Sequence, residues 1–363
     1  KAKVLKVIKR NTSSFVGRVY HENKNTFINV SPHQPKKIKL INTNEPLKDL
    51  SVVKVYITNW NERGPHAHGE LKKIISLPDN PLADHLYVTN KYLGHRFLYE
   101  DSAKIDGGDL EKIILNDKNR EDFTNLDTFS IDPDDAQDFD DAISISFNEN
   151  IYDLKVHIAD VSAFVKRGSD LDNAALQNSN SYYFPEKSYH MLPSELATKY
   201  CSLVPGENRL AVSLCFKLTN SGKILKERAC LSIIKNKHRL TYKEVNDILV
   251  KPQKSNLDKK IFLLFELHKT LKKNRLKDGA LDLVSTESIF SFDLVGTPSK
   301  IIEKKQDASH AMVEECMLLA NKYAAKLLGS KVNPIYRNHD MPSRRSFLRI
   351  EALISAFSNK PKN

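Results

Sequence analysis

Six aspartates fall within ten consecutive positions, residues 132–141, and no other feature limits the fold and chemistry of this chain as strongly. Carboxylates this close repel one another, so a fold that brings them together needs protons or a cation between them. Oxygen ligands alone select hard ions, Mg²⁺, Mn²⁺ or Ca²⁺, over zinc. Because apolar or β-prone stretches flank the cluster at 129–131 and 142–147, the sequence predicts an acidic loop held between strands.

The cluster has two other interpretations. An EF-hand counted from Asp132 requires an oxygen ligand, a glycine and a glutamate at its fifth, sixth and twelfth positions, where this chain has Ala136, Gln137 and Ile143. The EF-hand interpretation therefore fails. A solvent-exposed acidic loop stays open, although no Lys or Arg lies within the cluster to neutralise its charge.

The excess of positive charge lies in one N-terminal segment. The whole chain has 56 Lys and Arg against 45 Asp and Glu, but residues 1–78 alone hold 15 against 5. The rest of the chain is almost balanced, at 41 against 40. This asymmetry favours a polyanion-binding domain joined to a neutral body, with a Lys-rich solvated surface as the alternative.

Short β-prone runs separated by turn residues fill the same segment and predict a small all-β barrel of the OB type. They are residues 4–8, 15–20, 26–30, 37–41, 52–58 and 71–75. Arg18 and Tyr20 share one face of a strand, and the segment contains four other aromatic residues. Such a barrel can stack bases on aromatics, although core packing would account for most of them equally well.

The remainder predicts a connector over 79–118 and an α+β domain over 119–363. Strands are predicted at 142–147, 152–161, 211–218 and 224–233, and helices at 241–249, 257–276, 309–328 and 346–357. Because strands and helices do not alternate strictly, an α+β domain is favoured over a doubly wound sheet. The whole chain is thus expected to be multidomain.

The cysteine and hydropathy patterns predict a cytoplasmic protein. The four cysteines form no CxxC pair, which argues against a zinc ribbon or a disulfide framework. No run approaches eighteen apolar residues, so no membrane span is expected. The chain begins at Lys1 without a basic-then-apolar leader, and we expect it to be a fragment of a longer protein.

A basic domain beside a carboxylate site indicates phosphodiester chemistry. Two divalent ions about 4 Å apart can activate a water molecule and stabilise the leaving oxygen of an in-line displacement. The residues by themselves therefore predict a metal-dependent enzyme acting on nucleic acid. They leave open whether the substrate is RNA or DNA and whether cleavage starts at an end.

A series of motifs keeps a fixed order over residues 129–345. The motifs are Ile131-Asp132-(x5)-Asp138-Phe139-Asp140-Asp141-Ala142, Val156-His-Ile-Ala-Asp-Val-Ser162, Tyr183-Phe-Pro185, Met191-Leu-Pro193, 196–203, Arg239-Leu-Thr-Tyr242, Glu314-Glu-Cys-Met-Leu-Leu-Ala-Asn321 and Arg337-Asn-His-Asp340. This series resembles the ribonuclease II and ribonuclease R family of 3′-to-5′ exoribonucleases, and is closest to ribonuclease R. The first 78 residues resemble the second of that family's two cold-shock OB domains.

The resemblance implies a Mg²⁺-dependent hydrolase, with Mn²⁺ able to substitute, that degrades single-stranded RNA processively from its 3′ end to nucleoside 5′-monophosphates. It also implies a monomer without a small-molecule cofactor. Asp132, Asp138 and Asp141 match the aspartates around the principal Mg²⁺. Asp140 matches the aspartate most tied to catalysis, through a second ion or its water. All four are expected to be catalytic, metal-binding residues.

The resemblance also assigns residues of the RNA path. Tyr183 matches the aromatic that clamps the terminal bases, unless the register is displaced by one to Tyr182. Tyr242 matches a further aromatic, with packing at a helix start as the alternative role. Arg18 and Tyr20 of the barrel are expected to contact RNA.

Three other polar residues invite a catalytic interpretation. His157 lies in an apolar strand and is expected to be structural, as is Asp160. Glu287 lies near a substrate-contacting acid of the family, but its register is open.

The chain departs from the family pattern at its C-terminal end. The family's Ser-Pro-x-Arg-Arg-Tyr motif, whose arginine stabilises charge on the scissile phosphate, and a later acidic residue do not occur. Losing one such donor can cost ~10²-fold in rate. We therefore expect the intact protein to be an exoribonuclease and this truncated segment to be weak or inactive alone. The alternative is a non-catalytic RNA-binding module or degenerate regulator of the same fold.

Overall fold

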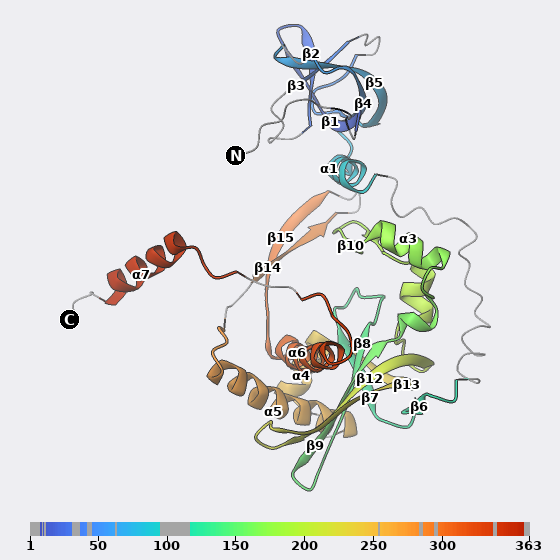
Figure 1. Cartoon of the computed structure of the whole chain (residues 1–363), viewed down its shortest axis with the longest axis vertical. Coiled ribbons are helices and arrows are strands. Elements are labelled where there is room, and N and C mark those ends of the chain that lie inside the picture. Colours follow the sequence, from blue (N-terminus) through green and yellow to red (C-terminus); the bar gives the residue numbers. More distant parts are fainter. Residues whose placement is uncertain are drawn as a thin grey trace. The chain divides into compact units, whose positions relative to one another are not determined.

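The computed structural model describes residues 8, 10, 12–30, 37–41, 46–61, 64–94, 117–252, 255–282, 286–293, 297–336 and 340–358. The chain divides into two compact units, Lys1–Cys316 and Met317–Asn363. The first unit contains an N-terminal barrel and a mixed α/β body (Figure 1). The boundary between the units falls inside helix α6 (Ala308–Gly329).

Five strands close into the N-terminal barrel. They are β1 (Ser14–Glu22), β2 (Asn25–Asn29), β3 (Lys37–Leu40), β4 (Val52–Asn59) and β5 (His66–Ser76), in the order β1-β2-β3-β5-β4. Val19, Ile28 and Val53 belong to its buried core. Gly17 permits the close approach of β1 and β2, because a Cβ there would lie 2.6 Å from the carbonyl oxygen of Asn29.

The structure confirms five of the predicted barrel strands and lengthens the last. The run at 71–75 is the second half of β5, which begins at His66. The run at 4–8 lies outside the described residues except for Ile8, which is not in a strand.

The predicted connector begins with helical structure that the sequence pattern did not predict. Helix α1 (Ala83–Val88) continues into a π-helical turn, η1 (Thr89–Leu93). Arg18 on β1 pairs with Asp84 of α1, and Tyr87 donates a hydrogen bond of 3.2 Å to the carbonyl of Val30. These contacts join α1 to the barrel. Gly107-Gly108 lies outside the described residues.

A curled six-stranded sheet forms the framework of the body. Its order is β12 (Asn208–Thr219), β9 (Ile151–Ala159), β8 (Asp141–Asn148), β7 (Thr128–Asp132), β13 (Ile224–Thr241) and β6 (Glu121–Asp122). The long β13 pairs antiparallel with β12 and parallel with β7. This mixed pairing confirms the predicted α+β class. The strands predicted at 211–218 and 224–233 are confirmed as parts of β12 and β13, and the turn between them has Gly222 at φ 77°.

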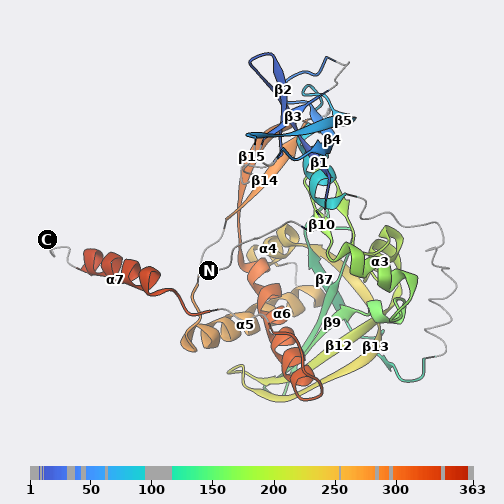
Figure 2. The same ribbon diagram turned by 45° about the horizontal axis from the view of Figure 1, so that its top comes forward.

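Helices α4 (Tyr242–Val250) and α5 (Asn256–Lys277) lie on one face of the sheet (Figures 1 and 2). Thr241 and Glu244 form a capping box that begins α4, and Ser255 caps α5. Ile261 and Leu264 of α5 are fully buried because they share its sheet-facing side. The predicted helices at 241–249, 257–276 and 309–328 are therefore confirmed.

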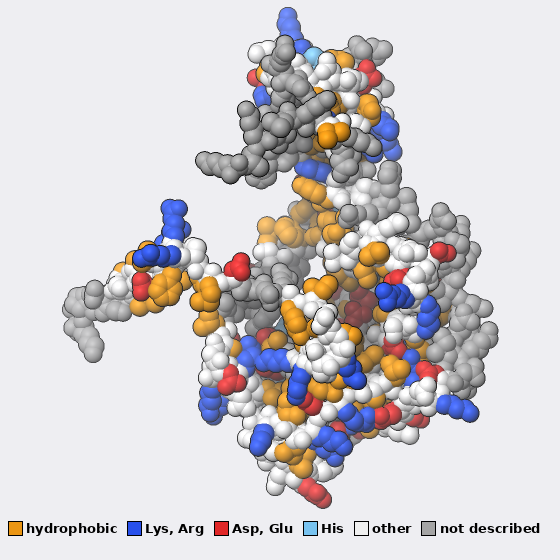
Figure 3. Space-filling model, in the orientation of Figure 1, with side chains coloured by type: hydrophobic (Ala, Val, Ile, Leu, Met, Phe, Trp, Pro, Cys, Tyr) orange, Lys and Arg blue, Asp and Glu red, His pale blue; other side chains and the backbone are white. Residues whose placement is uncertain are grey.

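The remaining elements of the first unit are short. They are η3 (Val161–Ala163), α3 (Asp170–Asn178), β10 (Tyr182–Tyr183), β11 (Ser188–Tyr189), η4 (Leu196–Tyr200), β14 (Thr286–Phe292) and β15 (Pro298–Lys305). Basic and acidic side chains are interspersed over the visible face of the body, as its balanced composition predicts (Figure 3).

The second unit holds the end of α6 and helix α7 (Arg344–Ser358), which confirms the predicted helix at 346–357. Apolar side chains of α7, among them Phe347 and Leu353, are exposed. No described helix is long and apolar enough to cross a membrane. All four cysteines are free.

Candidate active site

The acidic cluster lies on the loop between two adjacent strands of the sheet. Asp132 is the last residue of β7 and Asp141 is the first residue of β8. These strands pair antiparallel, with Phe129 opposite Ile143, so the two aspartates are brought to the same edge of the sheet. Residues 133–140 cross between them, as the sequence predicted.

A cavity of about 1040 Å³ opens beside this loop. Asp132, Asp138 and Asp140 line it from the loop side, together with Asp135. The β10–β11 hairpin also lines it, with Tyr183 among the lining residues. Three of the four predicted metal-binding aspartates therefore share one cavity.

Asp141 does not line the cavity but interacts electrostatically with the aspartates that do. Burial raises the pKa of the Asp141 carboxyl to about 6, and the charges of Asp132 and Asp140 act in the same direction. Burial likewise raises the pKa of Asp132 to about 6. The pKa of Asp140 is raised by desolvation and by the charge of Asp138. The site therefore holds carboxylates that favour a neutralising proton or cation.

The chemistry of these donors fits a hard divalent cation. The donors are carboxylate oxygens, and Oδ2 of Asp132 is buried without a hydrogen-bond partner in the described part of the chain. The side chains are not arranged as a preformed metal site. Across the described ranges, no three His, Cys, Asp or Glu side chains are grouped closely enough to form a ligand set. By the type of their donor atoms, Asp132, Asp138, Asp140 and Asp141 are the residues that could hold a cation.

Tyr183 connects the hairpin to the acidic loop. Its hydroxyl donates a hydrogen bond of 2.8 Å to Oδ2 of Asp138, while its side chain stays 63% exposed. Desolvation and the neighbouring Asp138 raise the pKa of Tyr183 to about 12, so the hydroxyl keeps its proton. An exposed ring beside the carboxylates could stack on a nucleotide base.

The hairpin itself is held by a buried histidine of α1. Nδ1 of His85 lies 3.1 Å from Oε2 of Glu186, and its Nε2 lies 3.0 Å from the hydroxyl of Tyr189. The ring of Phe184 packs edge-on against the same imidazole, with 5.2 Å between ring centroids. These contacts fix the short hairpin that carries Tyr183.

Two residues near the cluster were not found by sequence reasoning. Nδ1 of His190 lies 3.9 Å from Oδ2 of Asp138, and its ring meets Tyr183 edge-on. Arg239 on β13 donates to the backbone of the acidic loop at Pro133 and Asp134. Arg239 belongs to a motif of the family resemblance, but its local pattern gives no sign of this contact.

The other predicted RNA-binding residues are not among those that line the acidic cavity. Tyr242 stacks on His310, with ring centroids 3.7 Å apart and planes inclined by 9°. Arg18 is paired with Asp84, and Tyr20 stacks on Phe27 at 5.5 Å. Their contacts with RNA stay predictions.

His157 and Asp160 have the structural surroundings that the sequence predicted. His157 is fully buried, with Nε2 3.1 Å from Ser144 Oγ and Nδ1 2.6 Å from Ser213 Oγ. Burial lowers its pKa to about 3, so the imidazole is neutral at pH 7. Asp160 accepts a hydrogen bond of 2.6 Å from the buried guanidinium of Arg120. The side chain of Glu287 and residues 337–339 lie outside the described part of the chain.

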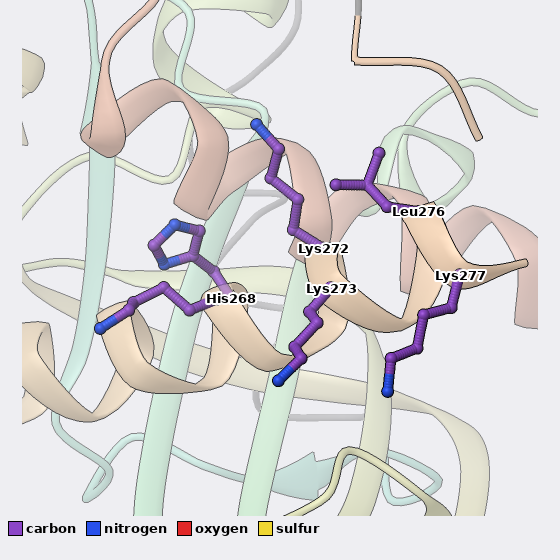
Figure 4. Close-up of a pocket in the computed structure, with 6 residues that line it drawn as sticks. His268, Lys272, Lys273, Leu276 and Lys277 are labelled. Atoms are coloured by element: carbon purple, nitrogen blue, oxygen red, sulfur yellow. The ribbon is translucent and has the colours of Figure 1, made fainter. Parts of the chain in front are cut away.

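A second depression, of about 500 Å³, runs along α5 and is lined without carboxylates. Lys273 and Lys277 extend from the same side of the helix (Figure 4). Lys272 is paired with Asp282, and the imidazole of His268 is largely buried. Lysines and a buried imidazole supply no acidic ligand set, so this depression is not a candidate for the predicted metal chemistry.

Comparison with known proteins identifies the family of the chain. Residues 120–363 match the family model of the RNB domain, which contains the curled sheet and the acidic loop. Ribonuclease R of Chlamydia trachomatis is 39% identical over 231 residues, which are 63% of this chain and 33% of the relative. Ribonuclease R of Aquifex aeolicus is 29% identical over 370 residues, 99% of this chain and 52% of the relative.

The chain belongs to the ribonuclease II and ribonuclease R family. It spans about a third to a half of the length of these curated relatives. The fold agrees with that of Mycoplasma genitalium RNase R in complex with double-stranded RNA, at a TM-score of 0.83 and 24% identity over 100% of this chain and 66% of that chain. Yeast Ssd1, a pseudonuclease, has a TM-score of 0.71 at 16% identity over 98% of this chain and 46% of that chain.

Proposed function

We propose that this chain is the cation-holding part of a Mg²⁺-dependent 3′-to-5′ exoribonuclease that degrades single-stranded RNA processively to nucleoside 5′-monophosphates. One observation carries the proposal: the hydroxyl of the exposed Tyr183 is bonded to Asp138 at the acidic cavity. A base stacked on this ring would have its phosphate within reach of the carboxylates. Stacking tolerates any base, which suits a nuclease without sequence preference.

The four aspartates would hold the divalent cations, with Mn²⁺ able to replace Mg²⁺. Bound Mg²⁺ would supply Lewis-acid stabilisation of the phosphate and a water of lowered pKa. Asp140 lines the cavity and is proposed to orient the attacking water, while Asp132 is buried and Asp141 is half-buried at the strand ends. Tyr183 holds Asp138 and grips the terminal base.

The barrel is proposed to be an OB-type, cold-shock-like RNA-binding domain that guides the strand towards the cavity. Its strand order and the basic excess of residues 1–78 support this role. On one face Tyr20 stacks on Phe27, and Lys37 Nζ lies 5.4 Å from the centre of the Tyr20 ring. Arg18, already paired with Asp84, would give up that ion pair to bind a phosphate.

The activity is proposed for the intact protein rather than for this segment. The arginine-containing motif expected to stabilise the scissile phosphate does not occur in the sequence. Because transition-state electrostatics is a large catalytic term, we expect the segment to be at least about 10²-fold slower than a protein that contains the motif.

The second candidate function is RNA binding without cleavage. The likeness to Ssd1, a pseudonuclease, supports it, since the same fold occurs in a protein so described. Against it, all four aspartates of the motif are present, and two have a pKa raised to about 6. A site without catalytic use would gain stability by losing these charges.

The test uses a 5′-labelled RNA with a single-stranded 3′ overhang, incubated with Mg²⁺ or EDTA. The segment and a version extended through the expected arginine motif are compared. Shortening from the 3′ end in Mg²⁺ alone, mainly by the extended protein, would support the exoribonuclease. Tight binding without shortening by either protein would support the binding module.

A further inference from the structure

The loop that carries the aspartates is fixed at its start by one arginine. Nη2 of Arg239 donates hydrogen bonds of 2.7 Å to the carbonyl of Pro133 and 2.9 Å to the carbonyl of Asp134. Arg239 lies on β13, which pairs parallel with β7 (Figure 1), the strand that leads into the loop. Its Nε is buried without a hydrogen-bond partner among the described residues, so the contact depends on Nη2.

The same guanidinium also reaches the end of the loop. Its central carbon lies 5.6 Å from the centre of the Phe139 ring. Phe139 is buried, its N–H donates to Ser202 Oγ at 2.9 Å, and its carbonyl accepts from the N–H of Leu203 at 2.8 Å. A cation over an aromatic ring adds attraction to this packing. Arg239 therefore links a loop end that the core already fixes to the loop start.

The loop needs such a link because its charges repel one another. Asp138 and Asp140 each raise the pKa of Asp132 through their charge, whereas the positive charge of Arg239 lowers it. If Arg239 supplied no positive charge here, we would expect residues 134–138 to move outward into solvent, because this movement separates the repelling carboxylates. Neither of the two carbonyl contacts uses a carboxylate, so Arg239 can hold the loop while leaving every aspartate oxygen available.

We propose that Arg239 is a positioning residue that sets the geometry of the divalent-cation site by fixing the backbone of residues 133–139. For its effect on hydrolysis the inference rests on the proposed function, whereas its effects on the loop and on cation binding do not. Arg239 does not touch the cation or the RNA in this role. A lysine would keep the positive charge and a donor group, but it would lose the planar guanidinium that packs on the Phe139 ring.

The experiment uses the full-length protein that contains this chain, with Arg239→Met and Arg239→Lys. Arg228→Met is the matched control, because Arg228 also lies on β13 but pairs with Glu121. Mn²⁺ binding is measured by titration calorimetry, and hydrogen exchange is measured for the amides of residues 134–140. Hydrolysis over a Mg²⁺ series and RNA affinity in EDTA complete the set.

For Arg239→Met we expect the Mn²⁺ dissociation constant to rise about 10- to 100-fold, as for other residues that orient metal ligands. The amides of the loop should exchange faster, kcat should fall, and RNA affinity in EDTA should change less than twofold. Arg239→Lys should lie between this variant and the parent. Arg228→Met should behave like the parent in Mn²⁺ affinity and loop exchange.

Unchanged Mn²⁺ affinity and loop exchange in both Arg239 variants would overturn the proposal, even if hydrolysis fell. If Arg239→Met does not fold, Arg239→Lys decides: parental cation affinity and exchange refute the role, and weakened values support it. A parent that binds Mn²⁺ but leaves RNA intact would refute the exoribonuclease without touching the inference. If the parent cleaves RNA but the Arg239 variants bind Mn²⁺ as tightly as the parent, the exoribonuclease is supported and the role of Arg239 is refuted.

Discussion

The hydroxyl of Tyr183 donates a hydrogen bond of 2.8 Å to Oδ2 of Asp138. The tyrosine lies on a two-residue strand and the aspartate on a loop 45 residues earlier. This contact joins the residue proposed to grip a base with a residue proposed to hold a cation. We therefore expect the two parts of Tyr183 to have different effects. The ring should contribute to RNA binding, and the hydroxyl should contribute to catalysis through Asp138.

Removing the ring should weaken RNA binding more than removing the hydroxyl. Stacking of one base on an aromatic contributes about 1–3 kcal/mol, so Tyr183→Ala should lower RNA affinity about 5- to 150-fold. Tyr183→Phe keeps the ring and should stay within about threefold of the parent. Fluorescence anisotropy with labelled single-stranded RNA in EDTA measures both. Equal losses in the two variants would contradict a stacking role.

Asp140→Asn should abolish hydrolysis and preserve RNA binding. The amide keeps the volume of the side chain but cannot act as a carboxylate toward a cation or water, so we expect a loss of more than about 10²-fold in rate. Asp134→Asn is the matched control, because that side chain is exposed on the same loop and lies outside the cavity lining. Single-turnover RNA shortening in the extended protein is the measurement. Parental rates for Asp140→Asn would show its assignment to be wrong.

The raised pKa of Asp141 predicts a pH-dependent effect of Asp141→Asn on stability without metal. The folded carboxyl has a pKa of about 6 against 3.8 for an unperturbed one, so the folded state loses stability as pH rises through this window. The uncharged variant escapes that loss. At pH 7.5 in EDTA it should be more stable than the parent by about 1–3 kcal/mol, and near pH 4 the difference should shrink towards zero. Urea unfolding at the two pH values tests this, and a variant less stable at both would contradict it.

Divalent cations should make the parent more stable than Asp141→Asn, the opposite of the order expected in EDTA at pH 7.5. Mn²⁺ that binds only the folded parent at a hundredfold excess over its dissociation constant adds about 2.7 kcal/mol. Asp141→Asn, with one carboxylate fewer beside the cluster, should gain less. Thermal melts over a Mn²⁺ series check the expectation. Equal shifts in parent and variant would place the cation elsewhere.

His157→Leu should damage stability and leave the chemistry of the folded protein intact. The imidazole is fully buried between Ser144 and Ser213, and the leucine would leave both hydroxyls with one partner fewer. We expect a loss of about 2 kcal/mol in the free energy of unfolding and a kcat within about threefold of the parent. Urea unfolding and hydrolysis below the unfolding transition measure the two effects. A large fall in kcat at unchanged stability would show that His157 is catalytic.

Local patterns were sufficient for most of the elements. Short β-prone runs between turn residues predicted the barrel strands β1 to β4, and helical periodicity predicted α4, α5 and α6. The ends of the elements were predicted less well. For example, β13 runs to Thr241, eight residues beyond the predicted strand. Its extension pairs with β7, and such a pairing depends on a distant strand rather than on the residues of β13 itself.

Charge density, β-prone runs and apolar context act over a few neighbouring residues, so the sequence was sufficient to predict an acidic loop between strands, a basic barrel and a structural His157. Which distant groups meet that loop depends instead on long-range packing. Tyr183, His190 and Arg239 reach it from segments about 45 to 105 residues away. Their approach depends on the hairpin contacts of His85 and on the parallel register of β13 with β7. Register and hairpin packing are set by contacts between segments, and no local spacing encodes them.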